Sequence, residues 1–346
     1  MNGMGASARS RGALISVLLL AGLVAALVGY KSYGGLKRIG ELRATGSLRL
    51  NPEALAPPSG SEVIATGAQT LAYLNIVWPA LLFGVLISAG VHTMVTPQQL
   101  AAWFGQGVVK PQLSAAAAGT PLMLCSCCVA PMFPAVYRGS RRLGPSLAFT
   151  LAAPSLNPAA LLLSFLIFPL EIAGARLIMA IVLVVIVSAL VAKVAGPVPV
   201  PAPTAGESPQ SGDRVRDVLR AYVRSFGHIT VRTVPWIILG IWVSMLVANR
   251  IPLNTFASGG PKVLIVMLVA AGALLLTLPT LFEIPLALSL LTGGAPPGAA
   301  LAMLVAGPAI NLASLLVIAR HSHWKVAVLI AAAVWGTAIA GGLLIG

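Results

Sequence analysis

The chain has 346 residues, of which 58% are hydrophobic and only 9% charged. A soluble domain carries about 25% charged residues on its surface, so this composition excludes an ordinary soluble protein and predicts an integral membrane protein. The net charge of +14 at pH 7 does not indicate a nucleic-acid partner, because the basic residues gather in short connections between apolar segments, as in cytoplasmic loops of membrane proteins.

The chain begins with one apolar segment, residues 13–30, which follows Arg9 and Arg11. A signal peptide has a similar pattern, but this run is long and lacks a clear small-x-small cleavage site. We therefore predict an uncleaved membrane span. Residues 31–70 are polar, and residues 1–70 are expected to form an N-terminal span with a polar connection.

Eight further apolar segments predict a polytopic helical bundle, because about 20 apolar residues cross the hydrocarbon core of a bilayer. They cover residues 71–95, 113–137, 145–168, 171–195, 229–248, 261–292, 298–318 and 325–345. This pattern predicts an all-α integral membrane protein with many spans.

The segment 196–212 is rich in Pro, Gly and Ser and reads as a linker. Arginines at largely helical spacing follow it, which predicts a basic amphipathic helix on the cytoplasmic surface in contact with anionic membrane lipid. These arginines are Arg214, Arg216, Arg220, Arg224 and Arg232. The linker and basic helix, residues 196–228, would separate a first half (71–195) from a second half (229–346).

The two halves resemble each other. Without a gap, residues 130–158 match residues 284–312 at a shift of 154 positions, which aligns both glycines and prolines. The matched pairs are Pro131 with Pro285, Gly139 with Gly293, Gly144 with Gly298, Pro154 with Pro308, and Asn157 with Asn311. Upstream, a shift of 156 aligns Pro79, Gly84 and Ser88 with Pro235, Gly240 and Ser244. Repeated halves are typical of secondary transporters, whose substrate binds near the midplane between the repeats.

Prolines interrupt both halves at matched places. A proline removes a backbone donor and frees a carbonyl, which the bilayer tolerates only inside protein or beside a watery cavity. The main helix-breaking positions are Pro121, Pro131, Pro154, Pro285 and Pro308. The binding site is therefore expected at 119–137, 152–158, 277–285 and 306–311.

Two membrane topologies fit this pattern. If all nine apolar segments cross the bilayer, the repeats are parallel and the N-terminus lies outside. If 113–137 and 261–292 are re-entrant hairpins, the repeats are inverted and the N-terminus lies inside. The bias of basic residues toward the cytoplasm fits both alternatives equally.

Three cysteines lie within four positions at a proline-bracketed break: Cys125, Cys127 and Cys128. Thiolates are soft ligands that suit thiophilic species such as Cu(I), and trivalent arsenic also bonds to thiols. A structural alternative is that Cys acts only as a small buried apolar residue. The C-x-x-C spacing of Cys125 and Cys128 also permits redox chemistry.

Glu283 is an acid deep in an apolar segment, and an unpaired charge there is costly. It is predicted to be protonated, paired or facing a cavity, and it suits proton coupling; a structural carboxyl is the alternative. Asn157 and Asn311, in matched Pro-x-x-Asn contexts, either satisfy broken-helix carbonyls or contact substrate, and Ser155 is similar. The histidines at 92, 228, 321 and 323 are expected to be peripheral or solvated at the interface.

At these residues the chain resembles the ArsP/YraQ-type permeases. The resemblance rests on LCSCCVAPMFPAVYRGSRRLGPSLAFTLAAPSLNPAALLL (124–163) and FEIPLALSLLTGGAPPGAALAMLVAGPAINLASLLV (282–317) and covers about residues 71–346. It implies a permease fold, and characterised members export trivalent organoarsenicals. It also implies that Cys125, Cys127, Glu283 and the matched Pro and Asn positions belong to the family motif. The family pattern usually reads C-S-C-G, whereas this chain has Cys128 in place of the glycine.

We therefore predict a multi-pass permease of the bacterial cytoplasmic membrane that exports a small solute, such as a thiophilic metalloid species. The predicted substrate contacts are Cys125, Cys127, Cys128, Asn157, Asn311 and Ser155, with Glu283 coupling protons. No ATPase or hydrolase motif is present, so we expect a transporter that is not an enzyme, with no cofactor and no resident metal. The alternatives are a membrane thiol oxidoreductase using Cys125 and Cys128, and a non-transporting assembly component.

Overall fold

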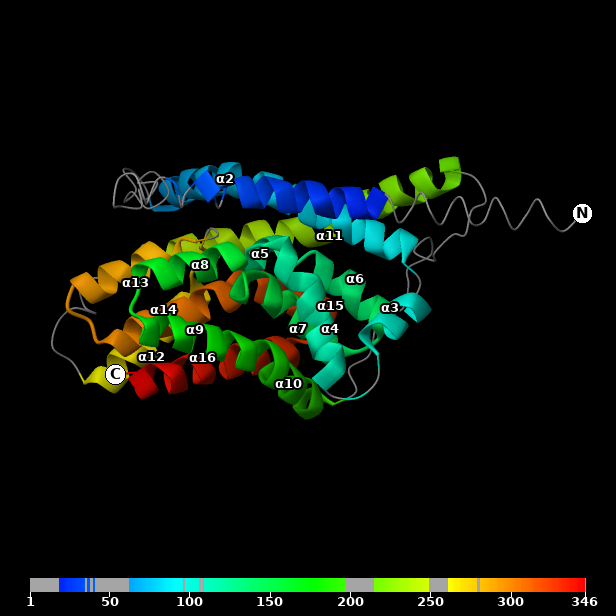
Figure 1. Cartoon of the computed structure of the whole chain (residues 1–346). Helices are drawn as coiled ribbons and strands as arrows, with labels where there is room; N and C mark the ends of the chain where they lie inside the picture. The colour runs from blue at the N-terminus through cyan, green and yellow to red at the C-terminus, as the bar shows by residue number, and fades with distance from the viewer. Residues whose placement is uncertain are drawn as a thin grey trace, which may run out of the picture.

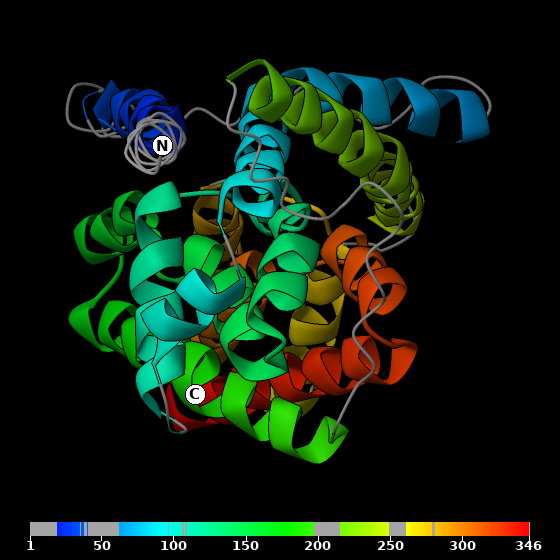
Figure 2. The same ribbon diagram turned by 90° about the vertical axis from the view of Figure 1, so that its right-hand side faces the viewer.

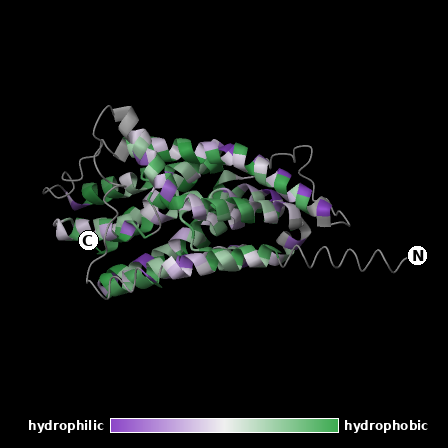
Figure 3. Ribbon diagram, turned by 90° about the horizontal axis from the view of Figure 1, so that it is seen from above, coloured by the Kyte–Doolittle hydropathy of each residue, from purple (hydrophilic) through white to green (hydrophobic). Residues whose placement is uncertain are grey.

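The computed structural model describes residues 19–34, 36–37, 40, 62–95, 97–105, 107, 109–196, 215–248, 261–278 and 281–345. Every regular element in these residues is a helix, and the long helices are hydrophobic over most of their length (Figure 3). Many large apolar side chains also face outward, including Leu170 and Leu344, as lipid contact requires. The prediction of an all-α membrane protein is confirmed.

A helix at Leu19–Gly34 comes first. The first half then contains α2 (Glu62–Met94), α3 (Pro97–Phe104), α4 (Val109–Gly119), η2 (Thr120–Leu122), α5 (Ser126–Val129), α6 (Met132–Ser140), α7 (Leu143–Ser155), α8 (Pro158–Ile167), α9 (Leu170–Ile181), η3 (Val182–Val187) and α10 (Ser188–Ala195). The second half contains α11 (Val215–Ala248), α12 (Lys262–Leu275), α13 (Glu283–Thr292), α14 (Pro297–Ala309), α15 (Leu312–His321) and α16 (Trp324–Ile345). The π-helical turn η3 joins α9 and α10 into one continuous rod.

The helix bounds follow the sequence repeat. Helix α7 and helix α14 begin 154 positions apart and end 154 positions apart, and the same holds for α8 and α15. Helix α9 and helix α16 also begin 154 positions apart. Similar sequence at this spacing therefore gives the same order of helices and the same break points twice.

The proposed boundaries at 70/71 and 228/229 fall inside helices, since α2 begins at Glu62 and α11 runs from Val215 to Ala248 without interruption. The basic lead-in segment thus forms the first turns of α11. The linker 196–212 lies outside the described residues except for Gly196 at its edge.

Among the described residues, four helices are long and apolar enough to cross a membrane, and two bent pairs raise the count to six. The bent pairs are α7 with α8, at 45°, and α14 with α15, at 42°. The segments 113–137 and 261–292 are each broken into short helices. Helices α4 and α6 lie toward one end of the bundle, and α12 and α13 toward the other (Figure 1).

Corresponding helices of the two halves pack against each other. Helix α2 contacts α11, α7 contacts α14, and α10 contacts α16; α2 and α11 lie together along one side of the bundle (Figure 2). Glycines also permit close approaches within one half: a Cβ at Gly298 of α14 would lie 2.0 Å from the carbonyl oxygen of Gly342 of α16. Small residues at such crossings let helix backbones approach closely, as is common in membrane bundles.

Candidate functional site

The break in the first half is built from an irregular backbone. The single turn η2 ends at Met123, which adopts a left-handed conformation (φ 50°, ψ 34°). Cys125 is extended, and its carbonyl accepts hydrogen bonds from the N–H groups of Cys128 and Val129, both at 3.0 Å. This short helix α5 turns the chain back so that the three cysteine side chains converge.

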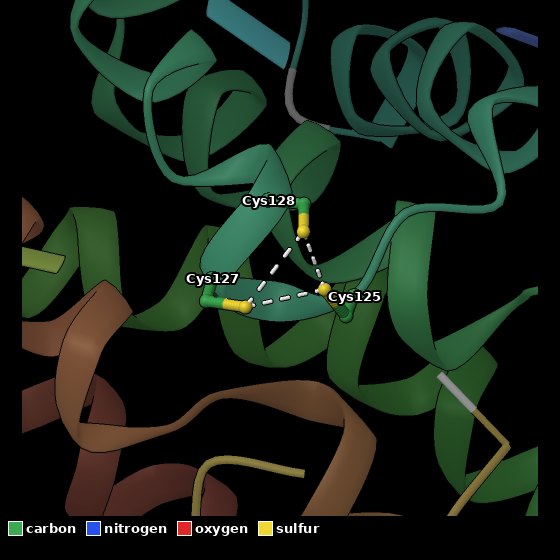
Figure 4. A group of neighbouring side chains, drawn as sticks. All are labelled: Cys125, Cys127 and Cys128. Atoms are coloured by element: carbon green, nitrogen blue, oxygen red, sulfur yellow. Dashed lines mark hydrogen bonds between the residues drawn. The ribbon is translucent and has the colours of Figure 1, made fainter. Parts of the chain in front are cut away.

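The three thiols form one compact cluster (Figure 4). The Cys125 sulfur lies 2.7 Å from the Cys128 sulfur and 3.2 Å from the Cys127 sulfur, and the last two sulfurs are 3.8 Å apart. All three cysteines are buried and free of disulfides. The sequence proximity of the cysteines therefore becomes a true side-chain cluster.

The three sulfurs are gathered closely enough that they could hold one soft ion. A centre about 2.3 Å from each sulfur, the usual Zn–S length, holds three sulfurs up to about 4 Å apart. The three cysteines are also the only group of three or more His, Cys, Asp or Glu ligands gathered closely enough to hold an ion among the described residues. The donor set is all sulfur, which selects thiophilic species.

Helix α2 covers the cluster from one side. The Tyr73 hydroxyl lies 3.7 Å from the Cys127 sulfur, and Tyr73 is almost fully buried. A Cβ at Gly84 would lie only 2.2 Å from the carbonyl oxygen of Cys128. The Ser88 hydroxyl donates to the carbonyl of Pro131 at 2.7 Å, and it thereby satisfies one carbonyl at the start of α6. Helix α15 of the second half also contacts α5, so the cluster lies between the two halves.

The two matched asparagines act as helix caps. The side-chain Oδ1 of Asn157 accepts hydrogen bonds from the N–H groups of Ala159 and Ala160 at the start of α8. The side-chain amide nitrogen of Asn157 donates to the backbone carbonyl of Met123 at 3.5 Å. Asn311 forms a capping box with Ser314 at the start of α15. The Asn157 amide thus satisfies a broken-helix carbonyl, one of the two roles predicted for it, whereas Asn311 accepts from an N–H group and its amide nitrogen has no partner among the described residues. A role in substrate contact stays a prediction.

Two buried polar atoms near these breaks have no hydrogen-bond partner among the described residues: the Ser155 hydroxyl oxygen and the Asn311 amide nitrogen. Each residue is at least 97% buried. A buried polar group without a partner is costly, so both atoms are suited to meet a polar ligand or water.

The prolines lie at or beside the breaks. Pro121 is in the turn η2, Pro131 precedes α6, and Pro285 is in the first turn of α13. Pro154 and Pro308 lie near the ends of α7 and α14, just before the bends. The second-half break before α13 also holds a left-handed residue, Leu281 (φ 76°). Strained backbone of this kind is concentrated at functional sites.

Glu283 is paired, which is one of the three states predicted for it. Its carboxylate accepts from the Arg176 guanidinium at 2.9 Å, and both side chains are buried. Arg176 also donates to the Ser164 hydroxyl of α8. The pair joins α9 of the first half to α13 of the second half, and its described contacts do not include the cysteines.

Sequence reasoning missed Arg176, although a signal was present. An arginine in the apolar segment 171–195 is as unusual as a glutamate in 261–292, and intramembrane charges normally have a partner. Pairing the two would have required knowing that α9 and α13 meet, which the sequence does not specify.

The fold and the buried site together define a polytopic membrane protein with broken helices around an internal site. The ArsP_1 family, described as predicted permeases, matches residues 65–203. The chain is 29% identical to the UPF0718 protein YraQ of Escherichia coli (strain K12) over 251 residues, which cover 72% of this chain and 71% of that protein. It is 27% identical to the UPF0718 protein MJ0584 of Methanocaldococcus jannaschii over 110 residues, 31% of this chain and 30% of that protein. No solved structure matches the chain.

Residues 65–203 are thus similar to the ArsP_1 predicted permeases, and 72% of the chain is similar to the YraQ protein. The family model covers the first-half break with its cysteines. These relatives favour a transporter of a small molecule over an enzyme.

Proposed function

We propose that this permease is a secondary transporter of the bacterial cytoplasmic membrane that exports a small thiophilic solute, with trivalent organoarsenicals as the candidate substrate. The observation that carries the proposal is the buried cluster of three sulfurs within 3.8 Å of one another. It lies at a backbone break between the two halves, where repeated transporters bind their substrates.

The donor set narrows the substrate class. A trivalent arsenical with one organic group can bond to two thiols, and an inorganic trivalent ion can bond to three. The third thiol, at Cys128, stands where the family pattern has glycine, so this chain offers three possible pairs of thiols or all three thiols together. Asn311 and Ser155 would add polar contacts through their buried atoms that lack partners.

Glu283 is proposed to couple transport to protons. Protonation of its carboxylate would weaken the pair with Arg176 and loosen one contact between α9 and α13. Because these helices belong to different halves, this change would alter how the halves hold together. Substrate binding at the thiols and proton binding at Glu283 would then act on the same interface.

Uptake into everted membrane vesicles tests the proposal. The chain is expressed in an arsenical-sensitive host, and accumulation of methylarsenite is measured with a proton gradient imposed. We expect uptake that requires the gradient and is lost in Cys125→Ser and Cys127→Ser, while Cys128→Gly, which restores the family pattern, keeps it. Uptake that is equal in vesicles with and without the protein would refute the proposal.

The 2.7 Å approach of the Cys125 and Cys128 sulfurs also fits the oxidoreductase alternative. Quantitative thiol trapping separates the two functions. A transporter keeps three free thiols throughout turnover, whereas an oxidoreductase forms a disulfide that is reduced and reformed with each cycle.

A further inference from the structure

The hydroxyl of Tyr73 is a polar group beside the thiol cluster. Tyr73 lies in α2 and is 1% exposed. Among the described residues, the structure records the Cys127 sulfur as the hydrogen-bond partner of this hydroxyl, at 3.7 Å. A buried hydroxyl costs free energy unless it is well paired, and a neutral thiol is a weak partner. The phenol is therefore suited to a stronger acceptor at the same place.

Tyr73 belongs to the face of α2 that packs on the first-half break. Gly84 and Ser88 lie 11 and 15 positions further along, close to three and four whole turns of 3.6 residues, so all three share one side of the helix. Gly84 packs against the Cys128 carbonyl, and Ser88 donates to the Pro131 carbonyl. The same helix face therefore holds both the phenol and the backbone that carries the thiols.

The phenol and the thiols occur in the same half of the repeat. At the shift of 156 positions, Tyr73 matches Ile229, a buried apolar side chain. At the shift of 154, the three cysteines match Pro279, Leu281 and Phe282. The equivalent helix position thus packs without a hydroxyl in the half that has no thiols. This contrast points to a role of the hydroxyl at the thiols and not in the packing of α2.

We propose that Tyr73 is a specificity-determining residue of the thiol site, which directs a bound trivalent arsenical to Cys127 by donating a hydrogen bond to its sulfur. The inference rests on the proposed function, in which the thiols bind such a solute. Each arsenic–sulfur bond that forms replaces an arsenic–oxygen bond. The thiol proton leaves with the hydroxide as water, so no oxidant or reductant takes part.

Loss of the thiol proton fixes the direction of the contact. Before binding, either the Tyr73 hydroxyl or the Cys127 thiol can be the donor. After binding, only the phenol can donate, and the sulfur has thiolate character, which makes it a stronger acceptor than a neutral thiol. An arsenical bonded to Cys125 and Cys128 alone gains nothing from Tyr73. The hydroxyl therefore favours the pairs of thiols that contain Cys127.

Equilibrium dialysis of the whole chain in detergent against methylarsenite tests this role, with bound arsenic measured by mass spectrometry. We expect Tyr73→Phe, which keeps the ring and removes the hydroxyl, to bind about three- to tenfold more weakly than the wild type. Tyr222→Phe is the matched control. It removes a hydroxyl that donates to the Leu86 carbonyl of α2 at 2.9 Å, and its affinity should equal that of the wild type. Melts without arsenical establish that both variants are folded.

The absorption spectrum of the arsenical-loaded chain separates this role from a merely structural one. A hydrogen bond withdraws electron density from the sulfur, so its loss should move the sulfur-to-arsenic charge-transfer band to lower energy in Tyr73→Phe and leave it in place in Tyr222→Phe. Equal affinity of Tyr73→Phe and the wild type, or a band that does not move, would overturn the role of Tyr73 and leave the proposed function standing. Absence of binding by the wild type would overturn the thiol site itself, and this role with it.

Discussion

Breaking the buried Arg176–Glu283 pair is expected to destabilise the fold strongly. The two charged groups are 2.9 Å apart, and their side chains are 1% and 4% exposed. At an effective dielectric constant of about 20, two charges about 4 Å apart attract by about 4 kcal/mol. Removing one partner also leaves the other buried without compensation, so each single change should cost about 3–5 kcal/mol.

A double-mutant cycle measures this coupling. The free energy of unfolding is determined by denaturant titration in mixed micelles for Arg176→Met, Glu283→Leu and the double variant. The double variant should recover most of the loss, because replacing both charges with apolar groups is often neutral. Lys193→Met, an exposed change on the same rod, should stay within about 0.5 kcal/mol of wild type. Strictly additive losses would refute the argument that the two residues act as a pair.

Three further predictions follow from the packing and the caps. Gly84→Ala should destabilise the protein by about 1–3 kcal/mol in detergent melts, because its Cβ would meet the Cys128 carbonyl at 2.2 Å; Gly67→Ala on the same helix, with nothing within 4 Å, should not. Asn311→Ala should cost about 1 kcal/mol in the same melts through loss of its cap, and no loss would contradict the capping role. The three buried thiols should react with maleimide slowly in the native protein and fully after denaturation; rapid native labelling would show that they are exposed.

The sequence contained enough information to predict the broad fold and the break points. Apolar length predicts spans, and the shift of 154 positions predicts which helices recur, because both depend on local patterns of residues. The breaks near Pro131 and Pro154 follow from proline stereochemistry alone. The division into four segments at 70/71, 195/196 and 228/229 stays a prediction, although two of these boundaries lie inside α2 and α11.

The contacts between helices were beyond sequence reasoning. The partner of Glu283 is Arg176, 107 positions away, and only the folded arrangement of the helices brings the two side chains together. The same holds for the cleft lined by His92, His228 and His321, because these residues look unrelated along the chain. Conversely, satisfying a broken-helix carbonyl was one of the two alternatives for Asn157, and the structure shows its amide donating to the Met123 carbonyl.

Flux through the purified chain, reconstituted alone in proteoliposomes, tests the central claim most directly. With an imposed proton gradient, methylarsenite should cross the membrane in vesicles that contain the wild-type chain. Replacing Cys125, Cys127 and Cys128 together by serine should reduce that flux to the level of protein-free vesicles. Flux that persists in a correctly folded triple-serine chain would show that the thiols are not the transport site.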